Sequence, residues 1–421
     1  MYNLIIHKNK SYKNLSLDKI LKFKEVDGNF CIIKKKNNNY YVFRDHLGTK
    51  KLFWSIKKGK VLFSNNFIKL SKLNKSNKNI KSFRSGFLTI LKKDGKIIHQ
   101  KKLKRPQIYL PSKITNKNIS SLIKNRINKF LKALKSNYGN EVYVCLSGGL
   151  DSTIIAYLAS KIFKKVTAIS GSMVNSNNYK KYLKVDDHNN KHFFSQDFLT
   201  AKKISKLLGI NFKPIIFNES QCLKDLKKVM YLSQDWRDFN VHCAILNFQI
   251  AKTLKKDRKY KSQPLITGDF MNEFVADYKS EKINDKLYYK IPIKNKKRKQ
   301  QFLINGLKSS DRENGVFNYF QIPSFQPYSI VSKIFENLPE NHLNDEDVKY
   351  KINGKIIDKK LLTIINKKKI RAQVGGKGGG ILGYMIKNKI DQKKLIKIFN
   401  KNFKFDDQFL KSFIFLGDYT N

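Results

Sequence analysis

Short alternations of apolar and polar residues fill the first part of the chain, and this pattern is typical of half-buried β-strands. Turns rich in Lys, Asn, Asp and Gly separate these strands in pairs. The predicted hairpins join residues 29–33 to 40–43, 51–54 to 60–64, and 86–91 to 96–100. The pattern therefore predicts a small β-rich module that ends near residue 105, followed by a linker over residues 104–115.

After the linker, apolar residues recur at helical spacing, and buried strands then alternate with helices. The predicted order is helix 120–136, strand 141–146, helix 153–163, strand 166–170, helix 198–208, strand 212–217, helices 223–232 and 241–254, and strand 265–267. Strands that alternate with helices indicate a parallel sheet built from right-handed βαβ units. Residues 280–300 are polar and are expected to form a loop, and most of the remaining chain is expected to be helical.

Length and composition indicate a folded, multidomain protein. With 41% hydrophobic residues, including 30 Phe and 20 Tyr among 421 residues, the chain has ample apolar surface to bury, which excludes general disorder. We predict two domains, residues 1–110 and 111–421. The sequence shows no signal peptide and no apolar run near the ~18 residues of a membrane span. The four cysteines lack the spacing of metal ligands or of a disulfide framework, so a reducing cytoplasm is predicted: Cys31, Cys145, Cys222 and Cys243.

The net charge of +54, from 86 Lys and Arg against 32 Asp and Glu, at first suggests a nucleic-acid or membrane partner. The excess is nearly all Lys, however, and it accompanies abundant Asn and Ile along the whole chain. That mixture favours a coding bias over a selected anion-binding face. We therefore expect no membrane partner and do not expect nucleic acid.

One segment carries most of the chemical information. A buried strand ends in Ser147-Gly148-Gly149-Leu150-Asp151-Ser152, and a helix follows. The two glycines permit a tight bend, and the backbone N–H groups of such a bend, together with the start of a helix, form a site for anions. Ser147 and Ser152 add hydroxyl donors, and Asp151 is suited to hold Mg²⁺ against phosphate oxygens. The Gly-Lys-Ser/Thr ending of a Walker loop is absent.

This bend resembles the pyrophosphate loop of the ATP pyrophosphatase superfamily, in which ATP is cleaved between its α- and β-phosphates and a substrate is adenylated. Asparagine, GMP, NAD, argininosuccinate and tRNA lysidine synthetases share the loop. Three further segments are similar to asparagine synthetases in order and spacing: residues 197–209, 268–278 and 310–325. The resemblance spans residues 140–335 and implies an α/β fold with the parallel sheet of the adenine nucleotide α-hydrolase type.

The resemblance also implies ATP and Mg²⁺ as cofactors. The implied ATP-binding residues are Leu146, Ser147, Gly148, Gly149, Asp151, Ser152, Ser170 and Gly268. Residues 268–273 resemble the family's Gly-Glu-Gly-Ser-Asp-Glu loop, which puts Asp269 at its proton-handling position. Asp151 is the expected Mg²⁺ ligand. Asn272 stands where the family has its Asp ligand and is a weaker ligand, so the second carboxylate is expected to be Asp269 or Glu273.

Three further candidates are less closely defined by the family pattern. The family uses a late Lys near a Gly-rich loop, and alignment on the glycines puts Arg371 there, with Lys377 or Lys369 as alternatives. Asp235 and Arg237 fall where the family has a loop beside the acceptor pocket, so Arg237 is a candidate for binding a substrate carboxylate. The alternative is a salt bridge within that loop. The remaining candidates lack metal-ligand spacing and are interpreted as structural or surface residues: His188, His192 and His242.

The N-terminal module resembles the later part of the family's glutaminase domain, a domain of the N-terminal-nucleophile (Ntn) type. Residues 43–54 match its Arg-Asp-x-x-Gly-x-Lys-Pro-Leu segment, and residues 61–65 match its Phe-Ala-Ser-Glu strand. Residues 1–42 are too few for the first half of that domain, and Tyr2 stands where the catalytic Cys is expected. Cys31 is interpreted as a core residue. We therefore expect a truncated module without glutaminase activity that retains a structural or docking role.

The resulting functional hypothesis is an asparagine-synthetase-like, ATP-dependent, amide-forming ligase. It would adenylate a carboxylate, of aspartate or a related acid, and transfer ammonia or an amine to it with release of AMP and pyrophosphate. The nitrogen would come from free ammonia, from a separate glutaminase subunit, or from the substrate itself, as in β-lactam synthetases and lasso-peptide cyclases. A tRNA-modifying adenylating enzyme and a catalytically degraded partner subunit are the rival hypotheses. A homodimer is left open.

Overall fold

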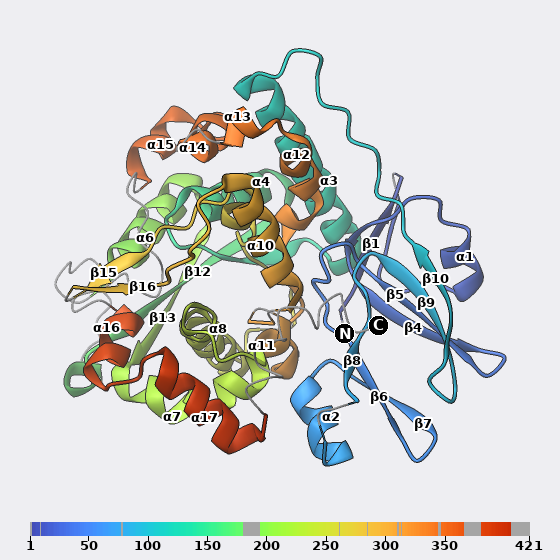
Figure 1. Ribbon diagram of the computed structural model, residues 1–421. Helices are drawn as coiled ribbons and strands as arrows, with labels where there is room; N and C mark the ends of the chain where they lie inside the picture. The colour runs from blue at the N-terminus through green and yellow to red at the C-terminus, as the bar shows by residue number, and fades with distance from the viewer. Residues whose placement is uncertain are drawn as a thin grey trace.

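The fold combines antiparallel sheets, formed by the first hundred residues, with a larger α/β unit (Figure 1). The computed structural model describes residues 2–8, 10–76, 79–179, 194–260, 262–283, 285–309, 311–312, 314–343, 347–365 and 380–405. Within these ranges, no helix is long and apolar enough to cross a membrane.

The N-terminal module contains three antiparallel sheets, with strand orders β2-β1-β3, β10-β9-β5-β4 and β7-β6-β8. Their strands are β1 (Leu4–His7), β2 (Lys10–Tyr12), β3 (Asp27–Asn29), β4 (Cys31–Lys36), β5 (Asn39–Arg44), β6 (Phe53–Lys57), β7 (Lys60–Ser64), β8 (Lys81–Ser82), β9 (Phe87–Lys92) and β10 (Ile97–Lys102). Two short helices accompany them, α1 (Leu17–Leu21) and α2 (Phe67–Asn74). All three predicted hairpins are confirmed, because β4 pairs with β5, β6 with β7 and β9 with β10 in antiparallel register.

The α/β unit is built on a five-stranded, fully parallel sheet with the order β13-β12-β11-β14-β17. Its strands are β11 (Glu141–Cys145), β12 (Lys165–Val174), β13 (Asn211–Asn218), β14 (Leu265–Ile266) and β17 (Ser324–Phe325). The predicted parallel sheet is confirmed. The strand β17 was not predicted, because it has one apolar residue, Phe325, and directly follows Pro323, whereas the equally short β14 consists of two apolar residues.

Helices cover both faces of this sheet (Figure 1). The first face is covered by α3 (Asn116–Tyr138), α4 (Leu150–Ile162) and α6 (Gln196–Leu208), with η2 (Pro327–Val331), α12 (Ser332–Asn337), α14 (Val348–Asn353), η3 (Gly354–Ile356) and α15 (Lys359–Ile364) packed around them. The second face is covered by α7 (Glu219–Ser233), α8 (Asp238–Lys256), α11 (Asn314–Tyr319), α16 (Gly380–Lys387) and α17 (Gln392–Phe403). In β11, Val142 and Val144 join the first core whereas Tyr143 and Cys145 pack against the second, as strand alternation requires.

The prediction of a loop over residues 280–300 is wrong. A short hairpin occupies part of it, β15 (Glu281–Ile283) with β16 (Lys286–Tyr288), and α10 (Lys296–Ser309) begins inside it. The polar composition was misleading because the hairpin is only partly buried and the first turn of α10 is nearly all basic. The other helices of the unit, within the described residues, are α9 (Met271–Phe274), α13 (Glu340–Leu343) and the short 3-10 helix η1 (Ser176–Asn178).

Lysine side chains from the N-terminal module cross to the α/β unit. The Nζ atom of Lys50 donates to Oδ1 of Asn314 and to the carbonyl of Ser324, both at 2.6 Å. The Nζ atom of Lys51 donates to the carbonyl of Leu307 at 2.7 Å. Both lysines are buried, and burial lowers the pKa of Lys50 to about 8. The module is therefore fixed to the segments that carry α10, α11 and β17.

The strand order places a ligand site. From β11 the chain goes to β12 and β13 on one side, whereas β14 and β17 lie on the other, so the order reverses between β11 and β14. In open α/β sheets, ligands bind at such a switch point, outside the carboxyl ends of the strands. The segments that leave the sheet there are residues 146–149 and 267–270.

Candidate functional site

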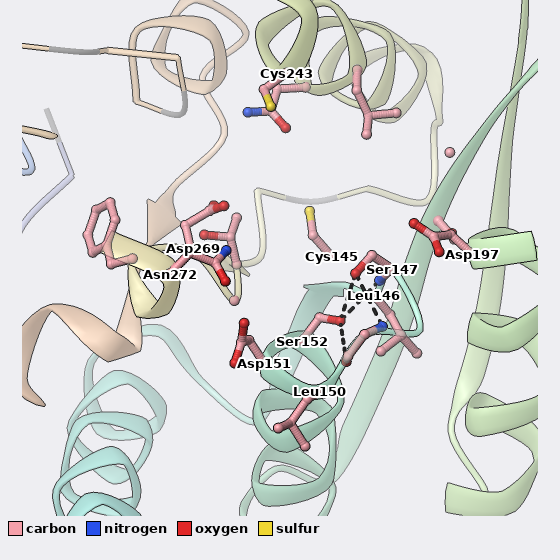
Figure 2. A pocket seen from close by; sticks show the side chains of 18 of the residues that line it. Cys145, Leu146, Ser147, Leu150, Asp151, Ser152, Asp197, Cys243, Asp269 and Asn272 are labelled. Atoms are coloured by element: carbon pink, nitrogen blue, oxygen red, sulfur yellow. Dashed lines mark hydrogen bonds between the residues drawn. The ribbon is translucent and has the colours of Figure 1, made fainter. Parts of the chain in front are cut away.

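The bend between β11 and α4 forms one wall of the site. Gly148 has a φ of +77°, and a Cβ atom there would lie 2.7 Å from Cβ of Thr200, so only Gly fits. The Oγ atom of Ser152 closes the bend, because it accepts from the N–H of Ser147 at 3.2 Å and donates to the carbonyl of Gly149 at 3.1 Å (Figure 2). Gly149 caps α4 without a side-chain hydrogen bond. The positive end of α4 therefore faces the site, where it favours an anion.

The loop after β14 lies directly against this bend. A Cβ atom on Gly268 would lie 2.8 Å from both N and Cα of Ser152. Asp269 follows, and burial raises the pKa of its carboxyl group while the Arg312 guanidinium opposes the rise. A carboxyl group that holds its proton more tightly than usual is suited to acid–base chemistry near neutral pH.

Phe270 stands at the second Gly position of the family loop, yet its backbone keeps a left-handed conformation with φ of +91°. A side chain in this region normally costs about 1–3 kcal/mol. The strain is retained because Phe270 is buried in the core and starts α9, which carries Asn272 and Glu273. The turn thus directs three polar side chains from one loop towards the bend.

A buried lysine that the sequence analysis missed lies among the expected metal ligands. The Nζ atom of Lys349, on α14, donates to Oδ2 of Asp151 at 3.2 Å and to Oδ1 of Asn272 at 3.0 Å. It also forms an ion pair with Asp277 at 3.4 Å. Burial alone would lower the pKa of Lys349, but the Asp151 and Asp277 carboxylates outweigh it and the pKa is raised. Lys349 is therefore a fixed cation, and nothing in the sequence distinguishes it among 86 basic residues.

A second polar cluster surrounds Glu273. The hydroxyl of Tyr278 donates to Oε1 of Glu273 at 2.6 Å, and Nη2 of Arg312 lies 3.5 Å from the same oxygen. Nη1 of Arg312 also donates to Oδ1 of Asn240 at 3.3 Å. Burial raises the pKa of Tyr278 well above its usual value, so its hydroxyl stays a donor. Arg312 lies in a segment that resembles the family, but the sequence alone predicted no role for it.

These groups, apart from Asn240, Asp277 and Thr200, neighbour or line one cavity of about 220 Å³, and Asp151, Asp269, Glu273, Tyr278, Arg312 and Lys349 all line it. The predicted residues that it brings together are Leu146, Ser147, Gly149, Asp151, Ser152, Ser170, Gly268, Asp269, Asn272 and Glu273. Gly148 does not line the cavity but shapes the bend against Thr200. Figure 2 shows Asp269 and Asn272 on one side of the bend and Asp197 on the other.

The cavity contains one feature that fits Mg²⁺. The Oδ1 atom of Asp151 is buried and has no hydrogen-bond partner within the described residues. Mg²⁺ takes oxygen ligands and is commonly bound through one or two carboxylates together with phosphate oxygens. The described residues contain no cluster of three or more His, Cys, Asp or Glu that could hold a metal ion, but a site of that kind needs none.

Asp235 and Arg237, the residues expected beside the acceptor pocket, lie outside the lining of the main cavity. Asp235 is fully buried, and its carboxylate accepts from Nε and Nη2 of Arg237 at 2.9 and 2.6 Å. Trp236 between them packs against Phe399 of α17. Neither Asp235 nor Arg237 lines the main cavity, and Arg237 lines a smaller one beside it. The salt bridge within the loop is thus present, and a role for Arg237 in substrate binding stays a prediction.

The outcome for the remaining candidates varies. His242 is buried, its Nδ1 hydrogen-bonds with the hydroxyl of Tyr289 at 2.8 Å, and burial lowers its pKa to about 3, which agrees with a structural role. Cys31 is buried, and burial raises its pKa to about 12, as a core residue requires. Five candidates lie outside the described residues: Arg371, Lys377, Lys369, His188 and His192.

Residues 135–302 match the family model for asparagine synthase. The match covers less than half of the chain and includes the bend, the Gly268–Glu273 loop and the first four strands of the parallel sheet. It confirms the resemblance to asparagine synthetases over these residues, and the predicted α/β class with a parallel sheet is also confirmed. The match indicates an enzyme, an ATP-dependent, amide-forming ligase of the pyrophosphate-loop type.

The solved structures named below resemble this chain with low sequence identity and low TM-scores. NMN synthetase from Francisella tularensis is 19% identical, with 60% of this chain and 92% of that chain covered and a TM-score of 0.27. NH₃-dependent NAD synthetase from Campylobacter jejuni is 14% identical, covering 66% and 96%, with a TM-score of 0.26. The U34-tRNA thiolase NcsA from Methanococcus maripaludis is 12% identical, covering 72% and 86%, with a TM-score of 0.32. No curated protein sequence matches the chain significantly.

Proposed function

We propose that this protein is an asparagine-synthetase-like ligase that adenylates a substrate carboxylate with ATP and transfers the acyl group to ammonia or an amine. The observation that carries the proposal is the close approach of two loops. The bend at the start of α4, a helix with no side-chain cap from any described residue, touches the loop that bears Asp269 and Glu273 at Gly268 and Ser152, and both line one cavity. A remote or occluded bend would have been incompatible with this function.

In the first step, a carboxylate oxygen of the acid bonds to the α-phosphorus of ATP, and the bond to the bridging oxygen of the β-phosphate breaks. Pyrophosphate leaves with the electron pair of that bond. The backbone N–H groups at the start of α4 and the ammonium group of Lys349 would stabilise the negative charge that develops on it. Because these donors are already held in place by the fold, they need no reorganisation during the reaction.

In the second step, the amine nitrogen attacks the acyl carbon and AMP leaves. The nitrogen must lose a proton as the amide forms, and Asp269 is our candidate to accept it. Burial makes the Asp269 carboxylate a stronger base than an exposed one, which supports this role. Arg312 lies near enough to lower the pKa of Asp269 and would balance charge when the proton moves.

Mg²⁺ would be held by Asp151, whose buried Oδ1 atom has no hydrogen-bond partner in the part of the chain that the structure describes. When bound, the metal ion would neutralise phosphate charge as a Lewis acid. Asn272 contributes an amide in place of the family's carboxylate, and its oxygen already accepts from Lys349. We therefore propose that Lys349 supplies part of the positive charge on this side of the cavity.

The nitrogen is proposed to come from free ammonia, from a separate glutaminase or from the substrate. Cys31 is the single cysteine among residues 1–110, and it is buried with a raised pKa. A reactive cysteine needs a lowered pKa and access to substrate. The contacts of Lys50 and Lys51 support a structural role for the N-terminal module instead.

The products of ATP cleavage test this proposal. Protein incubated with ATP, Mg²⁺, ammonia and a panel of carboxylic acids should release AMP and pyrophosphate in equal amounts, and only with an accepted acid. The variant Asp151→Asn should lose at least 90% of this activity. The matched control is Asp225→Asn, which removes a carboxylate that is paired with Lys252 outside the cavity. Release of ADP and phosphate, or full activity in Asp151→Asn, would contradict the proposal.

A further inference from the structure

A second cavity of about 120 Å³ adjoins the first. Four residues line both: Phe239, Glu273, Tyr278 and Arg312. The two cavities therefore meet at the polar cluster around Glu273, next to the bend that is proposed to hold the phosphates. An acid whose carboxylate reacts at the α-phosphorus has its other atoms directed away from the nucleotide, and the second cavity is an adjoining space that can receive them.

Most of the second cavity is lined by apolar side chains. They come from α10 and from the segment that follows β16: Phe302, Leu303, Leu307, Tyr289, Ile291 and Pro292. Leu303, Leu307 and Tyr289 are buried. A lining of this kind favours apolar groups, because burying a polar group without a hydrogen-bond partner costs free energy.

The cations beside this lining are already engaged or lie at the surface. Arg237 binds both oxygens of Asp235, and Arg312 contacts Glu273 and Asn240. Lys290 also lines the cavity, and it is exposed. A second carboxylate, such as that of aspartate, would need a cation held in the buried part of the cavity. The lining therefore fits an apolar body better than a dicarboxylic acid.

We infer that the acid acted on by this enzyme carries a branched aliphatic or single-ring apolar body, which occupies the second cavity. This inference rests on the proposed function and names the substrate class for the same site. The volume of the second cavity, about 120 Å³, agrees with a body of this size, since an engineered cavity of about 150 Å³ lined by Leu, Ile and Phe binds benzene. Each methylene group buried there is expected to raise the specificity constant by about fourfold.

Gly306 offers a way to fill this cavity without disturbing the fold. It lies within α10 and lines the second cavity, and among the described residues a Cβ atom on it would meet no heavy atom within 4 Å apart from its chain neighbours and the backbone of its own helix. The substitution Gly306→Leu places a side chain in open space and raises the helix propensity of α10. Gly306→Ala is the matched control, because it makes the same change in propensity but fills little of the cavity.

The experiment measures carboxylate-dependent ATP–pyrophosphate exchange, which reports adenylation and needs no amine. The acids are acetate, butanoate, 4-methylpentanoate, 3-phenylpropanoate and aspartate. In the unmodified protein, kcat/KM should rise about fourfold per methylene group, and 4-methylpentanoate should exceed aspartate by at least tenfold. Gly306→Leu should lower kcat/KM at least tenfold for the two largest acids and less than threefold for acetate, whereas Gly306→Ala, which adds only one methyl group to the cavity, should have a clearly smaller effect on the two largest acids than Gly306→Leu.

Each contrary result has a distinct meaning. Exchange that is fastest with aspartate, or exchange with the large acids that Gly306→Leu leaves unchanged, would overturn the inference and leave the proposed function standing. No exchange with any of the acids would overturn the proposed function and the inference with it. If thermal denaturation shows that Gly306→Leu does not fold, the order of the five acids in the unmodified protein decides.

Discussion

Replacing Lys349 by Met tests the buried cation at the centre of the site. The Nζ atom of Lys349 lies 3.2 Å from Asp151 and 3.4 Å from Asp277, and the lysine side chain is only 5% exposed. At an effective dielectric constant of about 20, each such pair attracts by about 5 kcal/mol before the cost of desolvation. Removing one partner of a buried pair typically costs about 3–5 kcal/mol, because the other charge remains buried and uncompensated.

We therefore expect Lys349→Met to lose about 3–5 kcal/mol of unfolding free energy, as measured by urea denaturation at pH 7 in EDTA. Mg²⁺ at millimolar concentration should restore part of this loss, because the carboxylate of Asp151 becomes available to the ion. The control Lys252→Met breaks a more exposed pair with Asp225 and should cost about 1 kcal/mol or less.

The pH dependence of this stabilisation has a definite sign. The pKa of Lys349 is raised in the folded protein, so its contribution is fully present below the unfolded value of about 10.5 and is lost as the pH rises through the folded value. A loss below about 1 kcal/mol in Lys349→Met, or a loss that Mg²⁺ increases, would refute the assigned role of Lys349 as the cation that compensates these carboxylates.

Three further predictions follow from the same geometry. Gly268→Ala puts a Cβ atom 2.8 Å from the backbone of Ser152, so it should lower the rate of ATP–pyrophosphate exchange about 100-fold. Gly306→Ala should not cause a loss of this size. Equal losses in the two variants would contradict a role for the close approach at Gly268. Burial lowers the pKa of both His46 and His242 to about 3, so unfolded chains bind more protons than folded ones below pH 6.5. Stability should therefore fall by about 2–3 kcal/mol per histidine between pH 6.5 and 4.5 in urea titrations, and His242→Asn should remove one of the two contributions. The pKa of Lys50 is lowered to about 8, so the contribution of Lys50 to the free energy of unfolding should rise by about 3 kcal/mol between pH 8 and 10.5. Lys50→Met should lack this rise. A difference in unfolding free energy between the two proteins that stays constant over this pH range would disprove the prediction.

The sequence predicted those parts of the fold and of the site that depend on local pattern. The β11 strand, the bend through Gly148 and the start of α4 follow one another along the chain, so apolar spacing and glycine chemistry were sufficient to place them. The hairpin between β4 and β5 was predictable for the same reason, because its register follows from alternation and from the turn that joins the strands.

The rest depends on contacts between residues far apart in the sequence. Lys349 is separated from Asp151 by 198 residues, and only the packing of α14 beside α4 brings the two together. The short strand β17 exists because β14 offers it an edge, which no local propensity can reveal. The α10 helix was obscured by its basic first turn, so its apolar side, which lines the second cavity, was not recognised.

The lysines that join the N-terminal module to the α/β unit have an evolutionary consequence. Lys50 and Lys51 donate to the main-chain carbonyl oxygens of Ser324 and Leu307, and every amino acid type provides such an oxygen. Side chains at positions 307 and 324 can therefore change among descendants without breaking these two bonds. A change at position 50 or 51 to a shorter or uncharged residue would break these bonds. Selection should therefore constrain the N-terminal side of this interface more strongly than the α/β side.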